Sequence, residues 1–243
     1  MPRAEGDGIL PLAFEAVSYE VRGVRLLAGV SFVLGAGPCS VILGPNGAGK
    51  SLVLRLADGL LAPTAGRVRW LGPGAARAAR ARALVFQRPV LLRRSAAANV
   101  DYALRLRGLP AQERARRAER VLAATGLEGL AGRPARRLSG GEQQRLALAR
   151  AWALEPEVLL LDEPASALDP AASRALEEAI RAIRAEGTKI VMTTHDLAQA
   201  ERMADEVLFL YRGRLLEHAP AAAFFHEPRS AEAKAFLRAE VLP

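Results

Sequence analysis

The sequence contains almost no cysteine, and this scarcity excludes two classes of site. Cys39 is the only cysteine among 243 residues, so neither a disulfide framework nor a metal site built from several cysteines is available. We expect Cys39 to be a core residue. Long apolar runs are also missing, since none approaches the roughly 18 residues that a membrane-spanning helix requires. The N-terminal residues lack the basic and then apolar order of a secretion signal, which predicts a cytoplasmic protein.

Lysine is scarce as well, because arginine supplies most of the positive charge. The formal net charge is +8, and residues 77–150 alone contain 17 arginines against 5 acidic residues. Two interpretations of this basic segment stay open. Its arginines form a solvated surface that reflects compositional bias, or they face a partner such as a nucleic acid or another acidic surface.

Apolar residues, in contrast, are abundant. They make up 51% of the chain, and the mean hydropathy is +0.09. A chain of this length and composition can bury a sizeable core, so we expect a globular protein.

One glycine-rich stretch lies between a predicted strand and a predicted helix. The strand is the apolar run 41–43, and the helix begins near Gly49 with an apolar face that includes Leu52, Leu54, Leu56 and Leu60. An ordinary glycine turn is the alternative, but these flanking elements favour a P-loop, whose backbone N–H groups surround a phosphate. The stretch consists of Gly44, Pro45, Asn46, Gly47, Ala48, Gly49, Lys50 and Ser51.

Two side chains of this loop have predicted roles of their own. Lys50 adds a positive charge for the β and γ phosphates of a nucleoside triphosphate. Ser51 offers a hydroxyl oxygen to the Mg²⁺ that such a nucleotide carries. The sequence therefore predicts a site for both the nucleotide and the metal.

Two carboxylates follow the buried-strand pattern of residues 158–161. Asp162 and Glu163 thus lie at the carboxyl end of a strand, where ligands collect in parallel sheets. We predict that Asp162 holds Mg²⁺, directly or through water, and that Glu163 is the general base that polarises an attacking water. A helix cap or surface turn is the ordinary interpretation of such a pair, but the P-loop favours the catalytic one.

Gln87 and His195 also follow predicted strands and are expected at the same edge of the sheet. Gln87 would face Mg²⁺ or water, and His195 would face a γ-phosphate. A histidine in this position is, on its own, more often structural.

A second anion-binding helix start lies in the segment between the two halves of the predicted sheet. Ser139, Gly140 and Gly141 open a long helix there. Because this segment is inserted into the core, we expect a symmetric dimer in which the Ser139 loop of one subunit covers the nucleotide of the other.

The order of these motifs resembles the ATP-binding subunit of ABC transporters over residues 14–225. In that family Gly44 to Ser51 correspond to Walker A, Gln87 to the Q-loop and His195 to the switch histidine. The remaining matches are Walker B at 158–163, the D-loop at 166–169 with Asp169, and the signature motif at 138–143 with Ser139, Gly140, Gly141 and Glu142. Tyr19 falls where the family's aromatic residue stacks on adenine, and Leu52 stands where most relatives have Ser or Thr.

This resemblance implies an α/β fold, namely a P-loop NTPase ABC cassette with a parallel-sheet core, a small antiparallel β region and an inserted helical subdomain. We expect a flexible tail at 1–11 and a nucleotide-binding core at 12–87, with short strands at 14–17 and 30–33 and a linker at 72–82. The helical subdomain with the signature motif is expected at 88–155, the remaining core at 156–220 and a helical tail at 221–243.

The resemblance also implies an ATPase that uses ATP and Mg²⁺ as a head-to-tail dimer. Its partners would be two integral membrane permease subunits at the cytoplasmic face of the membrane and a periplasmic or extracellular substrate-binding protein, with no nucleic acid. Residues 85–100, together with 49–52, are most similar to importers of tungstate and related oxyanions. An exporter subunit and a soluble ABC ATPase acting on nucleic acid are the alternatives.

Overall fold

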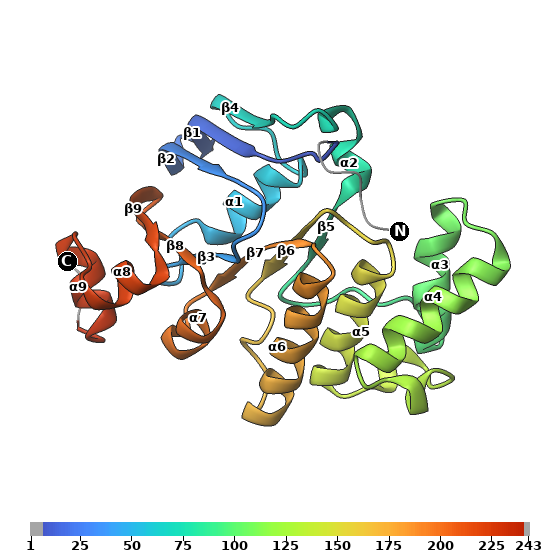
Figure 1. Ribbon diagram of the computed structural model, residues 1–243. Helices are drawn as coiled ribbons and strands as arrows, with labels where there is room; N and C mark the ends of the chain where they lie inside the picture. Colours follow the sequence, from blue (N-terminus) through green and yellow to red (C-terminus); the bar gives the residue numbers. More distant parts are fainter. Residues whose placement is uncertain (1–6, 241–243) are drawn as a thin grey trace.

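The computed structural model describes residues 7–240 and contains two β-sheets, one at the centre of the molecule and a smaller one at its edge (Figure 1). The strands are β1 (Leu12–Val21), β2 (Val24–Leu34), β3 (Ser40–Leu43), β4 (Ala65–Trp70), β5 (Arg82–Val85), β6 (Val158–Asp162), β7 (Lys189–Thr194), β8 (Glu206–Tyr211) and β9 (Arg214–Pro220). One sheet has the order β5-β6-β7-β3-β8-β9 and is parallel except for β9. The other is antiparallel, with the order β2-β1-β4.

The helices cover both faces of the parallel sheet. They are α1 (Lys50–Ala57), α2 (Ala78–Ala81), α3 (Ala96–Leu106), α4 (Ala111–Ala124), α5 (Gly140–Trp152), α6 (Pro170–Ala185), α7 (Leu197–Met203), α8 (Ala221–His226) and α9 (Ala231–Leu237). In Figure 1, α1 lies between the two sheets, whereas α5, α6 and α7 lie on the opposite side of the parallel sheet. Within residues 7–240, no helix has the length and apolar character to cross a membrane.

The strands of the parallel sheet are buried on both faces, which explains their continuous apolar runs. Every residue of β3 and β6 is buried. Alternate side chains then enter different cores: Val41 and Leu43 join the cluster that includes α3 to α6, whereas Ile42 joins the cluster that includes α1 and the small sheet. The predicted parallel sheet with two covered faces is confirmed.

The hairpin β1–β2 is longer than the two short strands predicted at 14–17 and 30–33. Arg22 and Gly23 connect it, with φ angles of 52° and 79°. Two successive positive φ angles are what a tight hairpin turn with matching strand twist requires. The sequence-based bounds were too short because Arg-Gly is a weaker turn signal than Asn-Gly. Tyr19 consequently lies within β1.

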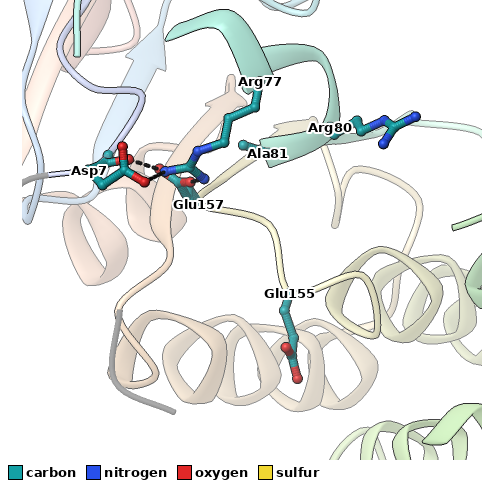
Figure 2. A pocket seen from close by; sticks show the side chains of 7 residues that line it. Asp7, Arg77, Arg80, Ala81, Glu155 and Glu157 are labelled. Carbon is teal, nitrogen blue, oxygen red and sulfur yellow. Dashed lines mark hydrogen bonds and ion pairs between the residues drawn. The ribbon is translucent and has the colours of Figure 1, made fainter. Parts of the chain in front are cut away.

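The expected flexible tail at 1–11 is wrong for residues 7–11; residues 1–6 lie outside the described part of the chain. Ile9 is fully buried, and its backbone N–H donates to Glu157 Oε2 at 2.8 Å. The N–H of Gly72 donates to the carbonyl of Ile9 at 3.1 Å. Arg77 pairs with both Asp7 and Glu157, as Figure 2 shows. These contacts come from distant segments, so local composition could not reveal them.

Two further expectations need correction. The linker predicted at 72–82 contains a 3-10 turn at Ala75–Arg77 followed by α2. Helix α1 ends at Ala57, so Leu60 lies beyond it and is 55% exposed rather than part of its apolar face.

The segment between β5 and β6 contains helices and 3-10 turns but no strand. Ser95 caps α3 by accepting a hydrogen bond from the Ala98 N–H at 3.2 Å, so this helix begins at Ala96. The subdomain boundaries at 88 and 155 stay predictions.

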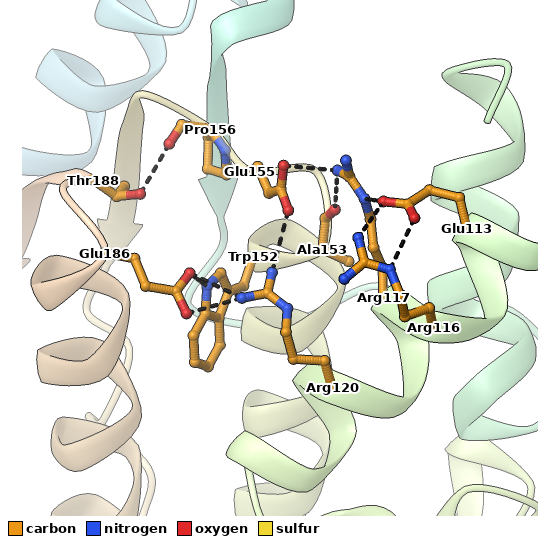
Figure 3. A network of polar contacts seen from close by, with 10 residues as sticks. All are labelled: Glu113, Arg116, Arg117, Arg120, Trp152, Ala153, Glu155, Pro156, Glu186 and Thr188. Atoms are coloured by element: carbon orange, nitrogen blue, oxygen red, sulfur yellow. Dashed lines mark hydrogen bonds and ion pairs between the residues drawn. The ribbon is translucent and has the colours of Figure 1, made fainter. Parts of the chain in front are cut away.

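Several arginines of the basic segment are paired with acidic residues outside it. Arg82 lies 3.3 Å from Asp58, Arg117 lies 3.0 Å from Glu155, and Arg120 Nη1 lies 2.8 Å from Glu186 (Figure 3). Part of the local charge excess is therefore balanced by carboxylates outside residues 77–150.

Candidate active site

The glycine-rich loop between β3 and α1 has a backbone that side chains would disrupt. Gly44 has φ 153°, and a Cβ there would lie 2.1 Å from the carbonyl oxygen of Leu210. Gly49 has φ 100°, and its Cβ would lie 2.6 Å from Leu27 Cδ2. The loop is thus held tightly against β8 and β2. Glycine permits both the positive φ angles and the close approach.

Lys50 is almost completely buried at the start of α1. It is 4% exposed, and its Nζ donates to the carbonyls of Gly44 and Pro45 at 2.8 and 3.1 Å. The same ammonium lies 3.1 Å from Glu163 Oε1. A buried lysine needs such partners, because an unpaired charge in this position would be strongly destabilising.

Asp162 and Ser51 meet at the carboxyl end of β6. The Ser51 hydroxyl donates to Asp162 Oδ1 at 2.7 Å, and the Thr193 hydroxyl donates to the same oxygen at 2.9 Å. This places a hydroxyl and a carboxylate side by side, the oxygen ligands that Mg²⁺ takes in nucleotide sites. The donor set fits Mg²⁺. Among the described residues, no group of three or more His, Cys, Asp or Glu side chains forms a metal site independent of a nucleotide.

Glu163 stands at the centre of the remaining polar contacts. Its Oε2 lies 3.0 Å from His195 Nδ1 and 3.4 Å from Gln87 Nε2, while Oε1 faces Lys50. Gln87 Nε2 also donates to the Ser166 hydroxyl at 3.1 Å. The structure therefore brings the predicted base, glutamine and histidine together at one sheet edge.

These residues line an open cleft of about 550 Å³. Its lining includes residues 46–52, together with Gln87, Glu163, Ser166 and His195. Leu52, which was predicted as part of the nucleotide site, is among them. Leu26 of β2 also lines the cleft and adds an apolar wall that the sequence did not reveal. Its position next to the cleft depends on how the small sheet packs on the loop.

Tyr19 is not among the side chains that line this cleft. It is half-buried in β1, paired in register with Leu27, and packs on the core beneath the small sheet. Its predicted stacking on adenine stays a prediction.

Ser139, Gly140, Gly141 and Glu142 begin α5 and are not found in the described lining of the cleft. Ser139 and Glu142 form a capping box: Ser139 Oγ accepts from the Glu142 N–H at 3.3 Å, and Glu142 Oε2 accepts from the Ser139 N–H at 2.7 Å. The bond from the Ser139 backbone lowers the pKa of Glu142. A Cβ on Gly141 would lie 2.9 Å from the Cβ of Ala172 in α6.

Asp169, the predicted D-loop residue, is the N-cap of α6. Its Oδ1 accepts from the N–H groups of Ala171 and Ala172 at 2.9 Å, and the bond from Ala172 is the main cause of its lowered pKa.

Comparison with known proteins assigns the family. The family model described as "ABC transporter" matches residues 27–166. The chain belongs to the ABC transporter family. It has the ATP-binding cassette fold, with its parallel sheet and small antiparallel sheet.

Individual relatives of this ABC protein resemble it over most of its length. Phosphate import ATP-binding protein PstB 2 of Natronomonas pharaonis is 36% identical over 248 residues, covering 95% of this chain and 87% of that protein. Tungstate uptake system ATP-binding protein TupC of Peptoclostridium acidaminophilum is 37% identical over 196 residues, covering 80% and 92%. The solved structure of cbiO1 from Clostridium perfringens superposes with a TM-score of 0.80 at 29% identity, covering 93% and 94%.

Proposed function

We propose that this chain is the ATP-hydrolysing subunit of an ABC importer and that the cleft beside Lys50 is its catalytic site. The observation that carries the proposal is the convergence of Lys50, Ser51, Glu163 and His195, which come from distant parts of the sequence, on one cleft. Asp162 accepts a hydrogen bond from the Ser51 hydroxyl beside it. The relatives named above, which are import or uptake ATP-binding proteins, support the same function.

Each side chain has a role that follows from its contacts. Lys50 binds phosphate oxygens, because the carbonyls of Gly44 and Pro45 hold its ammonium within the loop. Ser51 and Asp162 hold Mg²⁺, which when bound neutralises charge on the phosphates.

Glu163 carries out the proton transfer, and its neighbours orient it. This carboxylate accepts a proton from the attacking water. His195 and Gln87 contact its Oε2 and fix the direction of the carboxylate.

Replacement of Glu163 by glutamine tests the catalytic assignment. Glu163→Gln keeps the shape of the side chain but removes the base, so we expect ATP binding to persist while turnover falls by about 10²-fold or more. The mutant dimer should then accumulate in its closed form, which gel filtration with Mg-ATP detects.

Glu178→Gln, at an exposed position of α6, is the matched control and should behave as wild type. Wild-type turnover in Glu163→Gln, or a monomer at high protein concentration with nucleotide bound, would contradict the role.

The proposal includes a head-to-tail dimer in which Ser139 and Gly141 act on the partner's nucleotide. It is supported by the absence of the signature residues from the described lining of their own chain's cleft. Mixing Lys50→Ala chains with Gly141→Asp chains should give heterodimers with one intact site and one doubly defective site. ATP-dependent closure of the mixture is expected, although neither mutant closes alone. A mixture that stays open, with both chains folded, would refute the shared site.

We further propose that the subunit joins two membrane permeases and a substrate-binding protein, and that the cargo is tungstate or a related oxyanion. Relatives named for tungstate uptake and for phosphate and molybdenum import support an oxyanion, while others are named for methionine, Fe(3+) and nickel import. Uptake of radiolabelled tungstate, phosphate, methionine and nickel by the reconstituted transporter separates these cargoes. Transport of methionine or nickel but no oxyanion would overturn the assignment.

A further inference from the structure

Thr193 makes two hydrogen bonds at the centre of the proposed catalytic site. It lies in β7 directly opposite Asp162 of β6 and is fully buried. Its hydroxyl donates to Asp162 Oδ1 at 2.9 Å and accepts from the backbone N–H of Glu163 at 2.9 Å. One hydroxyl therefore contacts both the proposed magnesium ligand and the proposed base.

Each of these bonds constrains a different part of the site. Asp162 Oδ1 receives one hydrogen bond from Thr193 and another from Ser51, so the orientation of the carboxylate is fixed from two sides. Glu163 has a φ of 42°, in the left-handed region that is strained for a non-glycine residue. The Thr193 hydroxyl binds the N–H of this strained residue, which helps to keep its backbone in that conformation.

The Thr193 hydroxyl is a polar group that follows an apolar part of strand β7. The preceding residues of β7, Ile190, Val191 and Met192, are buried and apolar. A valine would suit such a strand as well as threonine does, and it would need no hydrogen-bond partner. The Thr193 hydroxyl instead serves as a donor to the Asp162 carboxylate and as an acceptor for the Glu163 N–H.

We infer that Thr193 is a positioning residue, which orients Asp162 toward the magnesium site and holds the backbone of Glu163 so that its carboxylate meets the attacking water. Thr193 touches neither the nucleotide nor the water in this scheme. The inference rests on the proposed function of the cleft.

The test compares Thr193→Val, which removes the hydroxyl, with Thr193→Ser, which keeps it. Thr193→Val should lower kcat about tenfold, the change that loss of one hydrogen bond to a charged group produces. It should also weaken the Mg²⁺-dependent part of binding of a fluorescent ATP analogue, while affinity without Mg²⁺ stays at the wild-type value because the Lys50 contacts are intact. Thr193→Ser should restore both properties.

Thr188→Val is the matched control. Thr188 is also buried, at the start of the same strand region, and its hydroxyl donates to the carbonyl of Pro156 at 2.9 Å, away from the cleft. The Thr188→Val variant should be less stable than the wild type, but the Mg²⁺ dependence of its nucleotide binding should not change. If Thr193→Val does not fold, Thr193→Ala replaces it in the same comparison.

Several outcomes would overturn the inference. Wild-type kcat and Mg²⁺ dependence in Thr193→Val would do so, as would a Thr193→Ser variant as impaired as Thr193→Val. An inactive wild-type protein would count against the proposed function, and the Mg²⁺-dependent binding measurement would then still decide the role of Thr193.

Discussion

Arg120 connects helix α4 to the ends of α5 and α6, and its removal should measurably weaken the packing of α4 on these helices. Its Nη1 lies 2.8 and 3.0 Å from the two carboxylate oxygens of Glu186, at the end of α6. Its Nη2 lies 3.4 Å from Glu155, and its guanidinium lies 5.6 Å from the ring centroid of Trp152. Figure 3 shows Arg120 between these partners.

The expected size of the effect follows from the exposure of the partners. The Arg120 side chain is 34% exposed and that of Glu186 is 45% exposed, so the ion pairs are worth about 0.5–1 kcal/mol. The contact with Trp152 adds about 0.5–1 kcal/mol. Arg120→Ala should therefore lower the free energy of unfolding by about 1–2 kcal/mol.

Arg116→Ala provides a control from the same helix. Arg116 is 67% exposed and pairs with Glu113 three residues earlier in α4, so it does not join α4 to the core through that contact. Its loss should lower the free energy of unfolding clearly less than the loss of Arg120.

Urea unfolding of the wild type and both variants measures the difference. Repeating it at about 1 M salt, where the screening length falls to about 3 Å, should reduce the cost of Arg120→Ala to the part contributed by Trp152. Amide hydrogen exchange in α4 should become faster in Arg120→Ala, because the helix is then held less firmly against α5 and α6. Equal stability of the two variants at low salt, with unchanged exchange in α4, would refute this reasoning.

Two other predictions concern Gly49 in the glycine-rich loop and Glu206 at the start of β8. Gly49→Ala should abolish nucleotide binding with the fold retained, because φ 100° and contact with Leu27 exclude a Cβ; wild-type affinity in a nucleotide titration would contradict this. Burial alone would raise the pKa of Glu206, but hydrogen bonds from His218 and Ser40 and the charge of Lys189 lower it to about 2 from its usual 4.5. Its contribution to stability is thus present above about pH 4.5 and disappears toward about pH 2. The melting temperature of Glu206→Gln should lie below that of the wild type at pH 7 and approach it in acid. A difference in melting temperature that does not change with pH would refute the lowered pKa of Glu206.

The sequence alone determined the features that depend on neighbouring residues. The glycine-rich loop and the helix start at Ser139 were both predicted, and the structure contains each of them. Turn and cap geometry follows from φ preferences and from side chains a few positions away, so a short window of sequence contains the whole signal.

The two carboxylates of the candidate site could be predicted only because a strand pattern precedes them. Asp162 and Glu163 end an apolar run, and the carboxyl ends of parallel strands share one edge of the sheet. Residues at this edge are therefore expected near one another, but the strand pattern does not say which atom contacts which.

Only the tertiary structure decided which groups touch. The order of the sheet sets β7 between β6 and β3, and this brings Thr193 onto Asp162 and places Glu163 beside Lys50. The tertiary structure also decided that Ile9 is buried and that Tyr19 is not among the side chains that line the cleft. These contacts join residues far apart along the chain, and they form because burial of the apolar faces fixes the neighbours of every strand. No local pattern encodes that arrangement.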